Sequence, residues 1–153
     1  MFSKAEASQI RQEFWTTFGR YLRPQLSADG EKVNWINYKT GVKYVYFRME
    51  AENRLARISI EITHYDTGIQ ELFYEQFTEL KTMLQTYLNE DWEWQLHHED
   101  MEGKTISRIY TELPNASIYN RDDWPKLISF FKPRITALDE FWSVAKYNFD
   151  ELK

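Results

Sequence analysis

The segment LARISIEIT, residues 55–63, alternates apolar and polar side chains, and this pattern constrains the fold more strongly than any other feature of the sequence. Successive side chains of an extended strand point to opposite faces of a sheet. One face therefore carries Ala56, Ile58, Ile60 and Ile62, and the other carries Arg57, Ser59, Glu61 and Thr63. A strand of this kind covers a core with one face and can leave the other face in water.

The segment before it, residues 33–49, indicates two further short strands. Lys39, Thr40 and Gly41 form a turn signal between them, because glycine adopts a positive φ without strain. The second of these strands also alternates, with Val45, Phe47 and Met49 on one face and Tyr44, Tyr46 and Arg48 on the other. A second hairpin is predicted further along, from the segments WEWQLHH and KTISRIYTEL and the polar turn between them.

Three segments show helical periodicity. The first spans residues 3–22, and the second begins at Asp66 or Thr67 and runs to about Leu88. The third begins with Asp122 or Asp123 as its cap and Pro125 near its first position. Pro133 is expected to break or kink this helix, and residues 135–149 continue as an apolar stretch.

The order of elements is therefore α-β-β-β-α-β-β-α, within a single domain spanning residues 1–153. Hairpins connect neighbouring strands, so we expect an α+β fold with a mainly antiparallel sheet of about five strands and helices packed on one face. Aromatic residues make up 17% of the chain, which suits a large core and leaves rings available for an interface. A homodimer is compatible with this aromatic content, because one small core absorbs limited apolar surface.

Composition excludes several classes of protein. The net charge of −5 argues against a mainly electrostatic nucleic-acid binder, which would carry a basic excess. The chain has no cysteine, so disulfides, thiolate zinc sites and cysteine nucleophiles are excluded. The start of the sequence lacks an apolar signal region, and no segment is apolar enough to span a membrane. We therefore expect a cytoplasmic protein that does not associate with membranes.

The candidate site is the polar face of the predicted sheet. It brings together Tyr44, Tyr46, Arg48, Arg57 and Glu61. Tyrosine and arginine are favoured at protein interfaces, and aromatic rings beside arginines on an open sheet also stack single-stranded bases. The pattern leaves both readings open.

Catalytic chemistry is not supported by the motifs. The first six elements follow the order of a nuclease core whose Asp and Glu-x-Lys residues bind magnesium, but here Thr63 stands where the motif requires lysine. Glu50 lies only at the end of the preceding strand, and no aspartate occupies the expected place. We therefore expect no catalytic residue, and we expect Glu61 to be a sheet-surface residue paired with Arg57, Arg48 or another cation.

A metal site is not expected either. His97 and His98 are adjacent in a strand and point to opposite faces, so they cannot readily share one ion. Glu93, Gln95 and His97 would share a face, but one imidazole beside carboxylates is a weak metal signal. The sequence also lacks phosphate loops, dinucleotide fingerprints and nucleophile elbows, so no cofactor is expected.

Four stretches resemble a known family: WINYKTGVKYVYFRME, ARISIEI, EDWEW and DDWPKLISFFKPRITALDEFW. They are similar to the bacterial domain-of-unknown-function family 4268, over roughly residues 10–142. Longer proteins that resemble this family carry an N-terminal nuclease-like module, and this chain resembles the stand-alone form. The resemblance implies an α+β accessory domain connected with nucleic acid or defence, and it assigns no catalytic residue.

The sequence thus favours a non-enzymatic binding module that uses its aromatic and arginine-bearing sheet face. The partner is a protein that the sequence does not identify, or a second copy of the chain. The alternative is a nucleic-acid-associated protein, a degenerate relative of nuclease folds in DNA processing or defence.

Overall fold

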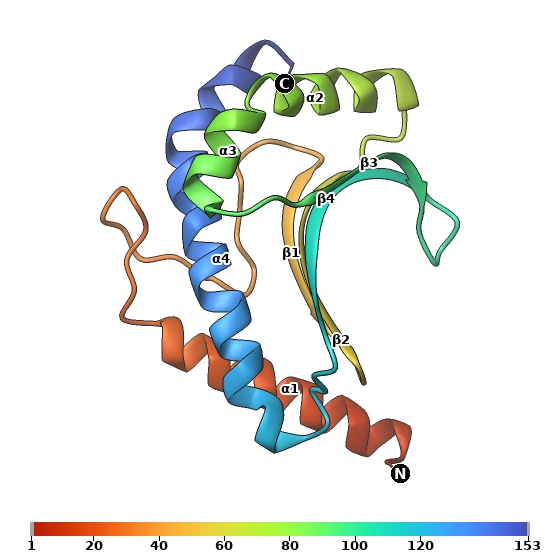
Figure 1. The fold of residues 1–153 in the computed structure, drawn as a ribbon, viewed down its shortest axis with the longest axis vertical. Coiled ribbons are helices and arrows are strands. Elements are labelled where there is room, and N and C mark those ends of the chain that lie inside the picture. Colours follow the sequence, from red (N-terminus) through yellow and green to blue (C-terminus); the bar gives the residue numbers. More distant parts are fainter. Residues whose placement is uncertain (1, 153) are drawn as a thin grey trace.

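The computed structural model describes residues 2–152 and has an α+β architecture (Figure 1). Its four strands form one antiparallel sheet in the order β1-β2-β4-β3. The strands are β1 (Val45–Ala51), β2 (Leu55–Ile62), β3 (Glu93–Glu99) and β4 (Thr105–Pro114). The helices are α1 (Lys4–Leu22), α2 (Thr67–Glu79), α3 (Lys81–Leu88) and α4 (Trp124–Ala145), with short 3₁₀ segments η1 (Arg121–Asp123) and η2 (Lys146–Leu152). The helices lie on one side of the sheet, and the other side has no helix over it (Figure 1).

The fold class is as predicted, but the first predicted hairpin is wrong. Gly41 does adopt a positive φ of 77°, yet no strand precedes it, so the sheet has four strands rather than about five. The observed order is α-β-β-α-α-β-β-α. Gly41 thus adopts the predicted turn conformation, but residues 33–40 do not pair with a strand of the sheet.

Buried side chains of α4 hold residues 28–40 in place. The carbonyl oxygen of Thr40 accepts a hydrogen bond of 2.6 Å from Nε1 of Trp142 on α4. The two carboxylate oxygens of Asp139, also on α4, accept bonds from the Ala28 amide at 2.7 Å and the Tyr38 hydroxyl at 2.6 Å. A long segment without helix or strand is thereby held against α4, because buried polar groups must be paired.

We expect Asp139→Ala to lower the free energy of unfolding by about 2 kcal/mol, because it removes a buried carboxylate and leaves the part-buried Ala28 amide and Tyr38 hydroxyl without their acceptor. Chemical denaturation would measure the change. Glu140→Ala is the matched control, since Glu140 is an exposed acid on the same helix. Equal stability of the two variants would show that Asp139 does not anchor residues 23–44.

The second predicted helix is divided in two. Asp66 caps α2 as expected, through bonds from the amides of Gly68 and Ile69, but Leu80 leaves helical geometry and α3 starts anew. The turn lets α3 pack against α4.

The last helix runs through Pro133 without a break, contrary to expectation. Pro133 is exposed, so the carbonyl that lacks its usual N–H donor faces the solvent side of the helix. Asn120 caps η1. Asp123 occupies the N-cap position of α4 and Pro125 lies in its first turn, as predicted, but Asp123 makes no side-chain cap bond to the helix. The carboxylate of Asp123 accepts instead from the Ser117 amide at 2.9 Å.

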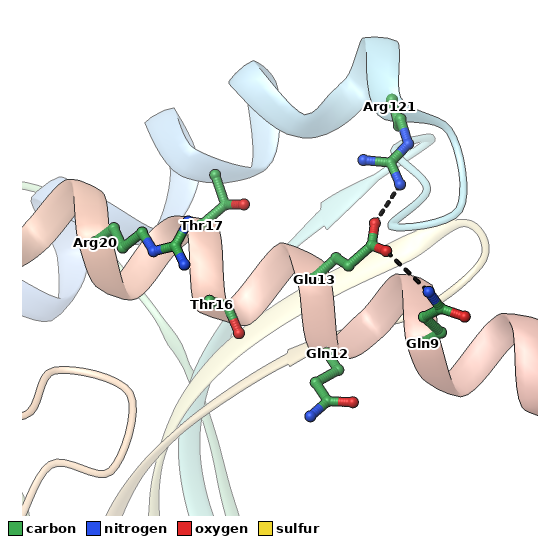
Figure 2. Close-up of a pocket in the computed structure, with 7 residues that line it drawn as sticks. All are labelled: Gln9, Gln12, Glu13, Thr16, Thr17, Arg20 and Arg121. Carbon is green, nitrogen blue, oxygen red and sulfur yellow. Dashed lines mark hydrogen bonds and ion pairs between the residues drawn. The ribbon is translucent and has the colours of Figure 1, made fainter.

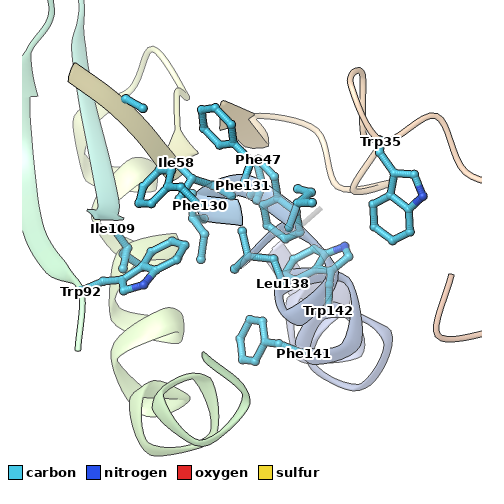
Figure 3. Packing of buried hydrophobic residues seen from close by; sticks show 14 of the residues in the cluster. Trp35, Phe47, Ile58, Trp92, Ile109, Phe130, Phe131, Leu138, Phe141 and Trp142 are labelled. Atoms are coloured by element: carbon cyan, nitrogen blue, oxygen red, sulfur yellow. The ribbon is translucent and has the colours of Figure 1, made fainter. Parts of the chain in front are cut away.

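The core lies between the helices and the apolar face of the sheet. The predicted set Ala56, Ile58, Ile60 and Ile62 is fully buried, which confirms the alternation of β2. Trp142 packs against Phe47 of β1 with ring centroids 5.6 Å apart, and Figure 3 shows both rings in this cluster. Most of the aromatic residues therefore lie in the core or pack against it. The polar face of β1 and β2 lies on the opposite side of the sheet from this core.

Candidate functional site

The open face of the sheet carries a hollow of about 720 Å³, referred to below as the open-face hollow. All five residues predicted from the sequence line it: Tyr44, Tyr46, Arg48, Arg57 and Glu61. Its other walls come from β4 and from the turn between β3 and β4, where the lining residues include His98, Asp100, Met101, Glu102, Lys104, Ile106 and Arg108. The sheet curves so that this turn bends toward the side away from the helices (Figure 1).

The strand register sets these side chains in rows across the sheet. Tyr46 of β1 stands opposite Glu61 of β2, which stands opposite Arg108 of β4. Gln95 of β3 completes this row, and its Oε1 accepts a 2.6 Å hydrogen bond from Nε of Arg108. Four strands therefore contribute one side chain each to a single polar row, as the period-two geometry of a sheet requires.

Glu61 occupies the floor of the open-face hollow. It is only 7% exposed, so the expectation of a solvated surface residue is wrong although its position on this face is right. Its Oε1 lies 3.0 Å from Nε of Arg48, one of the predicted partners, and Oε2 accepts a bond of 3.4 Å from the Ser59 hydroxyl. Burial raises the pKa of Glu61, and nearby Glu50 adds to the increase, while Arg48 opposes it.

This raised pKa predicts a pH dependence of stability. Between the ordinary pKa of a glutamate and the higher value in the folded state, the native protein binds more protons than the unfolded chain. The free energy of unfolding contributed by Glu61 therefore falls as the pH rises through that window. Glu61→Gln should flatten this part of the stability profile, measured by denaturant titrations from pH 4 to pH 8. An unchanged slope would show that Glu61 does not titrate abnormally.

Arg57 is held in an ion-pair network at one end of the open-face hollow. Its Nη2 lies 2.6 Å from Oε2 of Glu112, and its Nη1 lies 3.8 Å from Glu50. The guanidinium groups of Arg108 and Arg57 lie 4.2 and 5.8 Å from the ring centroid of Tyr110. Tyrosine and arginine side chains are thus interleaved over β2 and β4, although the sequence placed them only on β1 and β2.

Tyr44 belongs to an aromatic group at the rim. It lies just before β1 with a φ of 71°, so it is not part of the alternating strand as predicted. Its ring packs edge-on against His64 at 4.4 Å, and His64 stacks on Tyr65 at 4.5 Å. Tyr65 is 83% exposed and Tyr46 is 47% exposed, so aromatic surface is accessible to a ligand at this end.

The β3–β4 hairpin contains a bulge that reverses one prediction. The register shifts between Gln95 and His98, and His97 adopts a φ of 55°. Because of the extra residue, His98 and not His97 follows Gln95 on the open face and lines the hollow. His97 turns toward α2, where its Nε2 lies 3.1 Å from the Thr67 carbonyl oxygen. Within residues 2–152, no group of three histidine or acidic side chains is arranged to hold a metal.

A second hollow, of about 420 Å³, lies along α1. Figure 2 shows that its side chains come from one helix surface, with Arg121 reaching over from η1. Glu13, its one acid, is paired with Arg121 and also accepts a hydrogen bond from Gln9. Its one acid is thus already paired within the protein, and the open-face hollow, which also carries exposed aromatic surface, is the better candidate.

Sequence reasoning missed Arg108, Tyr110 and His98. The alternation of residues 105–113 was available, and it places Arg108 and Tyr110 on one face of a strand. The sequence did not show which strand lies beside this one. The neighbour is β2, which is separated from β4 along the chain by α2, α3 and β3. His98 was hidden by the bulge.

Comparison with known proteins identifies the family. The family described as "Domain of unknown function (DUF4268)" matches residues 10–146. The chain belongs to this family. The resemblance noted from the sequence is therefore confirmed over nearly the same range. No match was found among curated proteins or among solved structures. Within residues 2–152, no helix has the length and apolar character needed to cross a membrane.

Proposed function

We propose that this member of the family is a non-enzymatic binding module whose ligand-contacting surface is the open-face hollow. The observation that carries the proposal is the position of Tyr46, Arg48 and Arg57, which line one hollow that no helix covers. The volume of this hollow is within the range of ligand sites, and exposed tyrosine and arginine are typical of binding hot spots. The strands beneath it are paired along their length, so little backbone order has to be gained on binding.

The ion pairs of the hollow support a binding role over catalysis. Glu61 is paired with Arg48, and Glu50 with Arg57, so each of these carboxylates already has a cation as a partner. The nuclease-type arrangement would need these acids to coordinate magnesium beside a lysine. Thr63 lines the hollow at the position where the nuclease motif has its lysine, and a threonine side chain carries no positive charge.

The test is a selection of random peptides displayed on phage against the immobilised chain. We expect selected peptides to lose at least about a hundredfold in affinity for a Tyr46→Ala/Arg57→Ala variant, since each side chain is of the hot-spot type. The control is Tyr147→Ala/Arg23→Ala, which removes an exposed tyrosine and an exposed arginine elsewhere. Peptides that bind both variants equally well, or a selection that yields none, would contradict the proposal.

A nucleic-acid-associated protein is the second candidate. The Arg108 guanidinium over the Tyr110 ring, together with exposed Tyr46, supports it as a stacking platform for bases. Fluorescence anisotropy with single- and double-stranded DNA and RNA, in a salt series with magnesium or manganese, would decide. Affinity that falls steeply with salt would favour this candidate. Cleavage that disappears in Glu61→Ala would contradict a non-enzymatic role altogether.

The protein partner in this proposal can also be a second copy of the chain, which would give a homodimer. Sedimentation of the native protein and of the Tyr46→Ala/Arg57→Ala variant would separate this case from a different partner. The cytoplasmic location expected from the sequence stays a prediction.

A further inference from the structure

The charged groups of the open-face hollow do not pair evenly. Four cations and four acids line it. Every acid has a partner: Glu61 pairs with Arg48, Glu50 with Arg57 and Glu102 with Lys104. Asp100 accepts hydrogen bonds of 2.9 Å from two backbone amides of its own turn. The acids are therefore occupied within the protein.

Arg108 differs from the other three cations. Within residues 2–152 it forms no ion pair. Its Nε donates to Gln95, and its guanidinium lies 4.2 Å from the Tyr110 ring centroid, so the group is held in place on two sides. Its two Nη amino groups make no hydrogen bond to any described residue. A guanidinium fixed in this way presents free donors without a large entropic cost for ordering it.

The charge of Arg108 acts on the titratable groups around it. The pKa of His98 is lowered, first by burial and then by Arg108 and Arg57. Arg108 also acts on Glu61, whose carboxylate its charge favours. An anion that enters the hollow next to Arg108 would meet a cation that no carboxylate of the described chain neutralises in an ion pair.

We infer that the open-face hollow binds a peptide segment of a protein partner through a carboxylate of that segment, which pairs with the free Nη groups of Arg108. Arginine and carboxylate form two parallel hydrogen bonds, and such pairs are among the strongest in proteins. Apolar neighbours of the carboxylate would contact Ile106 in the wall and Met101, which is fully exposed at the tip of the β3–β4 turn. This inference rests on the proposed binding role of the hollow and names the chemistry of its partner.

A nucleic-acid backbone fits this site less well. A run of phosphates would lie close to four acids, three of them paired with a cation of the protein and Asp100 held by backbone amides, and like charges repel. A single carboxylate needs only one free guanidinium. The number and pairing of the charges therefore favour an acidic peptide.

The experiment compares two fluorescent peptides of about ten residues that differ only in charge, one alternating glutamate with leucine and the other glutamine with leucine. We expect the native chain to bind the acidic peptide at least about tenfold more tightly. Arg108→Ala should remove this preference, and Arg108→Lys should keep part of it, because lysine retains the charge but not the bidentate geometry. Lys43→Ala is the control, a cation outside the lining, and should keep the full preference.

The outcomes separate this inference from the proposed function. Equal binding of both peptides, or a preference that survives in Arg108→Ala, would overturn the inference and leave a binding module of other specificity. Failure of both peptides to bind would also overturn it, and the random-peptide selection would then decide the proposed function. Competition by single-stranded DNA that exceeds the acidic peptide in affinity would replace a protein partner with nucleic acid. Circular dichroism of each variant would confirm that it is folded.

Discussion

Trp142→Ala is expected to lower the free energy of unfolding by about 4 kcal/mol, because it removes a large ring from the centre of the core. The indole is 2% exposed and lies among Phe47, Phe77 and Phe149, with ring centroids 5.2–6.0 Å away. Its Nε1 also donates to the Thr40 carbonyl oxygen, which is buried and would lose its donor. The variant loses both packing and the attachment of residues 23–44 to α4.

Chemical denaturation followed by circular dichroism would measure this loss. Trp142→Phe separates the two contributions, because phenylalanine keeps much of the packing and lacks the N–H donor. We expect it to be less destabilising, by about 2 kcal/mol relative to the native chain. Tyr147→Ala, an exposed aromatic residue on η2, is the control and should change stability by less than about 0.5 kcal/mol. A small effect for Trp142→Ala would mean that α4 does not organise the core as described.

The second large effect is expected at Gln70, where stability and the binding surface are linked. Gln70 is fully buried, and its Nε2 donates to the carbonyl oxygens of His64 and Thr105 at 3.0 Å each. Its Oε1 accepts from the Ser107 hydroxyl at 2.6 Å, and that hydroxyl accepts in turn from the His97 amide. One amide side chain thus ties α2 to the start of β4, next to the β3–β4 turn, and to the bulge.

Gln70→Leu should lower the free energy of unfolding by about 3 kcal/mol, since it leaves buried polar groups unpaired in a low-dielectric interior. It should also weaken binding at the open-face hollow, because the bulge places His98 there. Denaturation would measure the first effect and peptide affinity the second. Glu71→Leu, at an exposed position one residue along α2, is the control. Full stability of Gln70→Leu would show that the bulge is fixed by the strands alone.

The sequence predicted most elements correctly where one local pattern decides the structure. The apolar residues of segment 55–62 and the periodicity of α1 each mark a face that is turned to the core, and both are confirmed, although Ser59 and Glu61 on the other face of β2 are buried as well. The predicted strand before Gly41 does not form. The Thr40 carbonyl oxygen instead accepts a bond from Nε1 of Trp142, a distant partner that a local pattern does not contain. The helix division at Leu80 likewise follows from packing of α3 against α4.

The same distinction applies to the candidate site. The five predicted residues lie around one hollow because four of them come from two strands that are adjacent in the sequence and paired, and Tyr44 immediately precedes β1. Arg108 comes from a strand that pairs with β2 across more than forty intervening residues, so its proximity to Glu61 requires the register. The burial of Glu61 also depends on neighbours from three strands and could not be read from its own segment.

The most direct test of the binding surface is a map of backbone amide chemical shifts of the ¹⁵N-labelled chain, with and without a peptide from the random selection. The account predicts that the changes concentrate on β1, β2, β4 and the turn between β3 and β4. Changes concentrated on α1 and α4, with the open face of the sheet unaffected, would contradict it.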